Sequence, residues 1–322
     1  MLIDAHSLSL NPAAHMVWGF AAVFAFLIVG TSAAVILPRF KAGEGFADLG
    51  KRMVSWWVII ALVAGALVGG WPATSALFAV VSFLALREFL SLAPARQEDR
   101  LIIFLIYLTI PISYFFVVIN IYMFYLVFIP VYVFLALPFL MACIGQTKGF
   151  LTSTATFHWG VMTCVYNIGF IALLMRVPRW DAPQAGAVGL VFLLLVATEG
   201  NDVFQYLTGK LFGRHKIVPA VSPKKTWEGF LGGWLLTAAM IVLIGPLFTP
   251  LHGVGLWTVA LTLPPAGFAG DITFSAIKRD IGVKDTSGFI PGHGGVLDRL
   301  DSLTFTSPLY FHLLAYFSLA TY

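Results

Sequence analysis

Charged side chains that could do chemistry are concentrated in residues 271–301, which hold five aspartates and four basic residues. If the first part of this segment is helical, Asp271, Ser275 and Lys278 fall at positions i, i+4 and i+7 and share one stripe of the helix. Carboxylates without a cluster of cysteine and histidine suit Mg²⁺ or another hard cation. The segment therefore predicts a site for a metal ion and an anionic ligand.

The end of the same segment contains a glycine-rich turn and two further aspartates. Glycines in residues 292–295 allow backbone conformations and close approaches that other residues do not. Asp298 and Asp301, three residues apart, would open the final helix on one face. Simpler interpretations remain open: the two aspartates can interact with the helix N-terminus, and His293 can be a turn residue bonded to the backbone.

A second acidic pair, Glu199 and Asp202, lies within a long apolar stretch and would share a helical face. Asp202 would lie about five residues, or roughly 8 Å, from the end of its helix that is expected on the cytoplasmic side. An ionised carboxylate at membrane depth costs about 2.5 to 3.5 kcal/mol. It therefore needs a basic partner on a neighbouring helix, a water-filled recess, or a substrate or metal.

A basic motif, Ser222-Pro223-Lys224-Lys225, precedes another apolar stretch. Serine followed by proline is typical of a helix N-cap and first helical residue. We expect the two lysines to flank a helix start whose free N–H groups favour an anion, so that they could hold a phosphate. The alternative is an ordinary basic loop at the inner membrane surface, anchored by Trp227.

The elements that must position these residues are membrane helices. Of 322 residues, 59% are hydrophobic and 11% are charged, whereas soluble domains carry roughly 25% charged residues. This composition excludes a soluble domain, a disordered chain and a simple nucleic-acid-binding protein. Continuous apolar runs of about 20 residues predict an all-α polytopic integral membrane bundle of about ten transmembrane helices rather than a barrel. The approximate spans are 15–37, 53–71, 73–93, 101–118, 119–142, 154–176, 186–207, 230–248, 254–276 and 303–321.

The basic residues predict which side of the membrane each loop faces. With the N-terminus outside, 17 of the 19 lysines and arginines fall on the inner side, and only Arg176 and Arg179 fall outside. Both termini are then expected outside. We expect the site on the cytoplasmic side, most simply of a bacterial inner membrane.

The organisation of the chain changes near residue 186. Residues 1–185 contain about six helices with short connectors, and acids there, such as Glu88, are assigned no chemical role. Residues 186–322 contain about four helices and two long polar cytoplasmic segments, roughly 208–229 and 277–302, with more than half of the 15 acidic residues. The C-terminal region is therefore the predicted catalytic domain.

A long motif from Ser275 to Asp301 resembles a known family. Its order S-x-I-K-R-x-x-x-x-K-D-x-S-x-x-I-P-x-H-G-G-V-x-D-R-L-D is similar to the signature of the phosphatidate cytidylyltransferases, or CDP-diacylglycerol synthases. The segments around Asp202 and Ser222 are also similar, so the resemblance covers about 190–302. Between Asp202 and Tyr206 the family has smaller residues than this chain, which bears on the lipid acceptor more than on the reaction.

The resemblance implies a Mg²⁺-dependent membrane enzyme, with room for a second cation, that joins CTP to phosphatidate and releases pyrophosphate. It also implies contacts with membrane lipids and no role for nucleic acid. As metal ligands we expect Asp271, Asp298 and Asp301, and as further catalytic residues Asp202, Lys278 and Arg279. As substrate-binding residues we expect Ser222, Lys224, Lys225, Ser275, Lys284, Asp285, His293 and Arg299.

Alternatives remain open at this point. The same chemistry could act on another lipid phosphate, or a CTP-dependent kinase could act on a lipid alcohol. A CDP-alcohol phosphotransferase is disfavoured because its Asp-Gly-x-x-Ala-Arg motif is absent, and an anion transporter because the charges gather at one surface without a repeat. The spacings Gly65–Gly69 and Gly229–Gly233 allow close helix contacts within the chain or in a homodimer.

Overall fold

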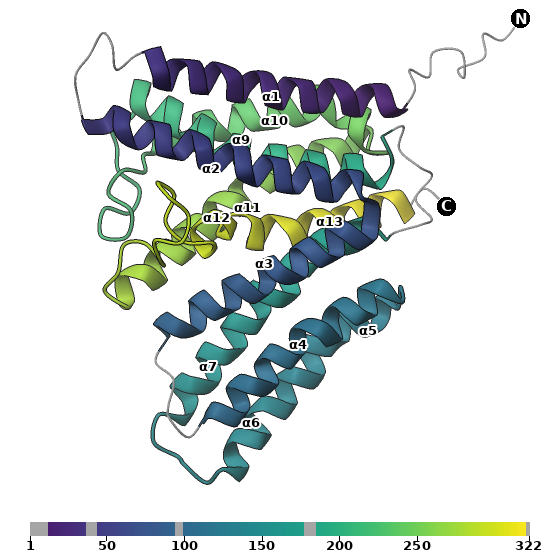
Figure 1. The fold of residues 1–322 in the computed structure, drawn as a ribbon, viewed down its shortest axis with the longest axis vertical. Coiled ribbons are helices and arrows are strands. Elements are labelled where there is room, and N and C mark those ends of the chain that lie inside the picture. Colours follow the sequence, from purple (N-terminus) through teal and green to yellow (C-terminus); the bar gives the residue numbers. More distant parts are fainter. Residues whose placement is uncertain (1–11, 37–43, 94–98, 177–184, 320–322) are drawn as a thin grey trace, which may run out of the picture.

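The computed structural model describes residues 12–36, 44–93, 99–176 and 185–319, and every regular element within them is a helix. The predicted all-α class is confirmed, and the prediction of about ten apolar helical segments is confirmed as well (Figure 1). The segments are α1 Pro12–Ile36, α2 Glu44–Val68, α3 Gly70–Leu92, α4 Arg100–Val118, α5 Tyr122–Val127 continued by η4 Phe128–Val133 and α6 Phe134–Cys143, α7 Phe150–Val161 continued by η5 Met162–Asn167 and α8 Ile168–Leu174, α9 Gly186–Phe212, α10 Trp227–Phe248, α11 Gly253–Asp280, the one-turn α12 Leu297–Leu300, and α13 Leu303–Leu319.

Eight of the described helical segments, from α1 to α10, are long and apolar enough to cross a membrane. The protein is therefore a multi-pass membrane protein. Its sidedness stays a prediction, because both chain ends and four of the basic residues that predict it lie outside the described part of the chain. These four are Arg39, Lys41, Arg96 and Arg179.

The helices of the predicted catalytic region lie together. In Figure 1, α11, α12 and α13 run through the middle of the molecule, and α3 to α8 form one end. At the other end α1 packs on α2 and on α9, where the Phe20 and Phe192 ring centroids are 5.4 Å apart. Polar contacts join the central helices: Asn201 Nδ2 in α9 donates to the carbonyl of Pro264 in α11 at 3.0 Å, and Thr198 and Thr306 hydroxyls join α9 to α13 at 2.9 Å. Hydrogen bonds thus join the helices of the predicted catalytic region within the apolar bundle.

Glycines allow α9 and α10 to pack closely. A Cβ atom at Gly233 would overlap the side chain of Gln205, and one at Gly229 would meet the backbone of Gly209 at 2.9 Å. The Gly229–Gly233 spacing therefore serves a contact within the chain. Open space surrounds Gly65 in α2, and the homodimer stays a prediction.

Two local expectations in the predicted catalytic region are wrong. Ser222 is not the helix N-cap: α10 begins at Trp227, and the Thr226 hydroxyl caps it by accepting a hydrogen bond from the Gly229 amide at 3.2 Å. Ser222 instead lies in a turn, where its carbonyl accepts from the Lys225 amide. Both residue types favour N-caps, and the loop closes by a bridge between Lys216 and Thr226, which places the cap four residues later.

The second correction concerns helix ends. α9 continues to Phe212, so Asp202 lies ten residues, or about 15 Å, from its end rather than roughly 8 Å. The final helix is also interrupted: Asp298 lies in α12, whereas Asp301 lies between α12 and α13. The break turns the chain so that both aspartates reach the same cavity.

Candidate active site

One cavity of about 180 Å³ gathers six charged side chains from segments far apart in the sequence. It is lined by Asp202 of α9, Lys225 before α10, Asp271 of α11, Asp298 and Arg299 of α12, and Asp301. A cavity of this size has room for a hydrated cation or a phosphate group. All six residues were expected at the site.

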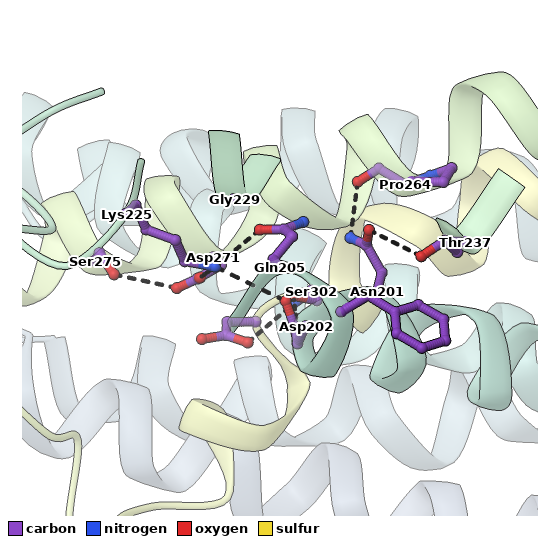
Figure 2. A network of polar contacts seen from close by, with 12 residues as sticks. Asn201, Asp202, Gln205, Lys225, Gly229, Thr237, Pro264, Asp271, Ser275 and Ser302 are labelled. Carbon is purple, nitrogen blue, oxygen red and sulfur yellow. Dashed lines mark hydrogen bonds and ion pairs between the residues drawn. The ribbon is translucent and has the colours of Figure 1, made fainter. Parts of the chain in front are cut away.

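Lys225 lies among the carboxylates (Figure 2). Its Nζ atom is 2.6 Å from Asp271 Oδ2 and 4.0 Å from Asp202 Oδ1, and it donates to Gln205 Oε1 at 3.1 Å. Burial lowers the pKa of Lys225, but the two carboxylates outweigh burial and raise that pKa above its ordinary value. The side chain therefore acts as the positive centre of the acidic cluster.

The cluster holds more negative charge than this lysine balances. Burial, followed by the charges of Asp271 and Asp202, raises the pKa of Asp301 well above its usual range. Asp202 Oδ2 accepts from the Ser302 hydroxyl at 3.0 Å, while its Oδ1 is buried and makes no hydrogen bond within the described part of the chain. The cavity thus presents oxygen atoms that further positive charge would stabilise.

Asp298 has a different environment because both of its oxygens are occupied. Lys278 Nζ donates to Oδ1 at 2.7 Å. Oδ2 accepts from the Thr286 amide at 2.8 Å, the Thr286 hydroxyl at 3.0 Å and the Gly295 amide at 2.9 Å. Burial raises the pKa of Asp298, but these hydrogen bonds outweigh it and leave the pKa below its ordinary value. Asp298 therefore also organises the turn that precedes it.

The predicted stripe on α11 exists. Ser275 Oγ lies 3.3 Å from Asp271 Oδ1, and Lys278, one turn further, reaches Asp298. Arg279 points elsewhere: its guanidinium is exposed and donates to the carbonyls of Val221 and Val283, both at 3.2 Å. It joins the end of α11 to the loop before α10.

The other expected substrate-binding residues that the structure describes do not line the cavity. Lys224, Lys284 and Asp285 are exposed, and Ser222 is partly buried in its turn. His293 packs edge-on against Trp56 of α2, with ring centroids 5.8 Å apart. Their proposed contacts with substrate stay predictions.

Three contacts escaped sequence reasoning. Gln205 holds Lys225, Ser302 holds Asp202, and Glu88 of α3 accepts from the Leu297 amide at 2.7 Å. Gln205 could have been noticed in the sequence, because it lies between Asp202 and Tyr206, where this chain departs from the family pattern. Glu88 was harder to notice, because the only indication was an acidic residue within an apolar helix. The sequence analysis gave it no chemical role, and so its contact with the site was not predicted.

The donor set fits a hard cation. Carboxylate oxygens are the ligands that Mg²⁺ prefers, and Oδ1 of Asp202 is buried without a hydrogen bond from any residue that the structure describes. Among the described residues, however, no three carboxylate, histidine or cysteine side chains are already arranged around a common point. Lys225 lies between the candidate ligands, so a cation would have to enter beside it or displace it.

Comparison with known proteins decides the family, because residues 50–317 match the cytidylyltransferase family. The chain belongs to this family. It is 39% identical over 300 residues to the uncharacterized protein YnbB of Escherichia coli (strain K12), covering 92% of this chain and 97% of that protein. This cytidylyltransferase is also similar to proteins that carry an enzyme name.

One of these is the phosphatidate cytidylyltransferase of Staphylococcus epidermidis (strain ATCC 12228 / FDA PCI 1200), 43% identical over 149 residues, 45% of this chain and 56% of that enzyme. Another is the phosphatidate cytidylyltransferase of Mycobacterium bovis, 41% identical over 128 residues, 38% of this chain and 39% of that enzyme. The match thus spans about half or less of these two relatives. The resemblance inferred from the Ser275–Asp301 signature is confirmed.

Proposed function

We propose that this protein is a membrane phosphatidate cytidylyltransferase that converts CTP and phosphatidate to CDP-diacylglycerol and pyrophosphate. The observation that carries the proposal is the cavity of four aspartates, one lysine and one arginine inside a cytidylyltransferase of the membrane. The names of the partial relatives support the same reaction. We further propose that the cavity opens to the cytoplasm and that the bilayer is a bacterial inner membrane.

The reaction forms a bond between a phosphate oxygen of phosphatidate and the α-phosphorus of CTP, and it breaks the bond from that phosphorus to pyrophosphate. The attacking oxygen is already ionised, so the enzyme needs no strong general base, and electrostatic stabilisation must provide most of the rate enhancement. Mg²⁺, when bound, screens the triphosphate and neutralises charge on the leaving pyrophosphate. Asp202, Asp271 and Asp301 would hold it, with Asp298 beside them.

The basic residues act on the phosphates. Lys225 lines the cavity with its charge fixed by Asp271 and Gln205. Arg299 lines it too, and its buried Nε atom makes no hydrogen bond with the described residues, so an anionic oxygen would satisfy it. Lys278 supplies further positive charge through its pair with Asp298. These groups hold both reacting phosphates against their mutual repulsion.

The position of the cavity suits an amphiphilic acceptor. Asp202 and Asp271 lie in α9 and α11, long helices that are mostly apolar. A lipid phosphate could therefore reach these residues while its acyl chains stay among apolar helices. CTP would approach from the polar loops around residues 213–226 and 281–296.

The decisive experiment uses the purified full chain in detergent, labelled CTP and phosphatidate micelles, with and without Mg²⁺. We expect Mg²⁺-dependent CDP-diacylglycerol. Asp271→Asn should abolish product formation while the protein stays folded, because it removes a cavity carboxylate and the closest partner of Lys225. Asp280→Asn, at an exposed position near the end of the same helix, is the matched control and should stay active. Wild-type turnover in Asp271→Asn would remove that residue from the site.

One observation favours a second acceptor class. Gln205 lies where the family has a smaller residue, and it contacts Lys225 directly. Another lipid phosphate is therefore the alternative acceptor, and a panel containing phosphatidate, a polyprenyl phosphate and diacylglycerol separates the possibilities. Product from the polyprenyl phosphate alone would change the substrate and keep the chemistry, whereas phosphorylated diacylglycerol would indicate a lipid kinase.

A further inference from the structure

An acidic side chain from the N-terminal helices reaches the catalytic segment. Glu88 of α3 is 8% exposed, and its Oε2 accepts a hydrogen bond from the Leu297 amide at 2.7 Å, across 209 residues of sequence. Leu297 directly precedes Asp298 and Arg299, which line the cavity. The contact therefore joins a helix without a previous role to the wall of the site.

The same turn is fixed from its other side. The Gly295 amide donates to Asp298 Oδ2 at 2.9 Å, so two carboxylates, Glu88 and Asp298, bind amides two residues apart. A Cβ atom at position 295 would overlap both Glu88 Oε1 and the Thr286 hydroxyl. Glycine is needed here because the Glu88 carboxylate lies against the backbone.

Packing alone does not explain an acid at this position. The neighbouring residues Leu86, Phe89 and Leu90 on α3 are buried in the apolar core, and burying a carboxylate is unfavourable unless it is hydrogen-bonded. Oε1 of Glu88 is buried and makes no hydrogen bond with the described residues. The interaction that offsets its burial is the bond to the Leu297 amide.

We propose that Glu88 is a positioning residue of the transferase, which fixes the Leu297 amide and so holds Asp298 and Arg299 at the cavity wall. The proposal rests on the proposed function, and it gives the N-terminal helices a part in the reaction. Glu88 itself touches no reacting group. The role requires an oxygen acceptor within hydrogen-bond distance of the Leu297 amide, as Oε2 is at 2.7 Å.

Reach and charge can be separated by two substitutions. Glu88→Gln keeps an oxygen acceptor at the same distance and removes the charge, whereas Glu88→Asp keeps the charge and withdraws it by one methylene group. We expect Glu88→Gln to keep at least half of the wild-type kcat/KM. Glu88→Asp should lose at least tenfold in kcat and show a higher KM for CTP. Arg87→Ala, an exposed neighbour on α3, is the control and should match the wild type.

Amide hydrogen exchange provides a second readout that does not depend on turnover. Exchange around Leu297 should rise in Glu88→Asp and stay at the wild-type level in Glu88→Gln and Arg87→Ala. A general loss of folding would instead lower the active fraction with KM unchanged and raise exchange throughout the chain, and this result would overturn the proposal.

Two further outcomes would also overturn it: a Glu88→Asp enzyme equal to the wild type, or a Glu88→Gln enzyme that is impaired although Leu297 stays protected. If the wild type forms no CDP-diacylglycerol, the proposed function fails separately. The kinetics of the Glu88 variants would then be measured with the lipid acceptor that the acceptor panel identifies. The hydrogen-exchange result does not depend on the acceptor.

Discussion

Replacing Lys225 by methionine tests the electrostatics of the cavity most directly. Methionine keeps an apolar stem near the Phe268 ring, over which Nζ lies at 5.5 Å, but it removes the ammonium group 2.6 Å from Asp271 Oδ2. At an effective dielectric constant of 20, this pair corresponds to about 6 kcal/mol of attraction before desolvation. Truncating one partner of a buried pair costs about 3 to 5 kcal/mol.

The lower end of that range applies here. The Lys225 and Asp271 side chains remain 22% and 20% exposed, so solvent weakens their attraction. We expect Lys225→Met to lose about 3 kcal/mol of stability without divalent cations, because its truncation leaves the facing carboxylates without their ammonium partner. Thermal unfolding in detergent with EDTA measures this loss. Lys224→Met, which removes an exposed charge next to it, should unfold like the wild type.

Added Mg²⁺ gives the second half of the test. A ligand that binds only the folded state stabilises it by about 2.7 kcal/mol at 100 times its dissociation constant. Without the competing ammonium, the carboxylates of Asp202, Asp271 and Asp301 should bind Mg²⁺ more tightly. Mg²⁺ should therefore raise the unfolding temperature of Lys225→Met more than that of the wild type. Equal unfolding temperatures in EDTA, or an equal Mg²⁺ effect, would refute the assignment of Lys225 as the internal counter-ion.

Three further substitutions test the surroundings of the cavity. Gln205→Ala removes the oxygen that accepts a hydrogen bond from Lys225. Because hydrogen bonds to charged groups contribute about 1.5 to 3 kcal/mol, CDP-lipid formation should fall roughly tenfold. Unchanged rates for every lipid acceptor would remove Gln205 from the site. Gly233→Leu should destabilise the α9–α10 contact by about 1 to 3 kcal/mol or more. The loss would be measured as a lower unfolding temperature, and a variant as stable as the wild type would show that the helices do not meet there. Thr286→Val removes one of the four hydrogen-bond donors to Asp298, a bond worth about 1.5 kcal/mol, so kcat should fall several-fold. Thr286→Ser keeps the hydroxyl and should stay active. A lower kcat in both variants would indicate that Thr286 acts through packing.

Much of the fold follows from the sequence because lipid restricts the alternatives. Backbone groups in hydrocarbon must be satisfied within each segment, so apolar runs of about 20 residues become helices, and their order is fixed by the chain. The stripe of Asp271, Ser275 and Lys278 was predictable for a related reason, since helical periodicity alone places these residues on one face. In this stripe a local rule was sufficient because all three residues lie on one helix.

Contacts between distant segments were not predictable in this way. Nothing in the sequence around Glu88 specifies that it meets Leu297, because helix packing decides which loop lies against which helix. Ser222 shows the same limit on a smaller scale: both it and Thr226 are good N-caps, and a loop closure elsewhere selects Thr226. The family signature marked the catalytic segment, but the partners that hold it required the structure.

The unsatisfied groups of the cavity have opposite signs, and this bears on what it binds. Among the described residues, Asp202, Asp271 and Asp301 share one ammonium group, and a buried oxygen of Asp202 makes no hydrogen bond. Arg299 lines the same space with a buried Nε that makes none with the described residues either. A free anion would satisfy the guanidinium and increase the repulsion from the carboxylates, while a free cation would do the reverse. A cation bound to a phosphate satisfies both, which favours a metal–nucleotide substrate over the transport of a simple anion.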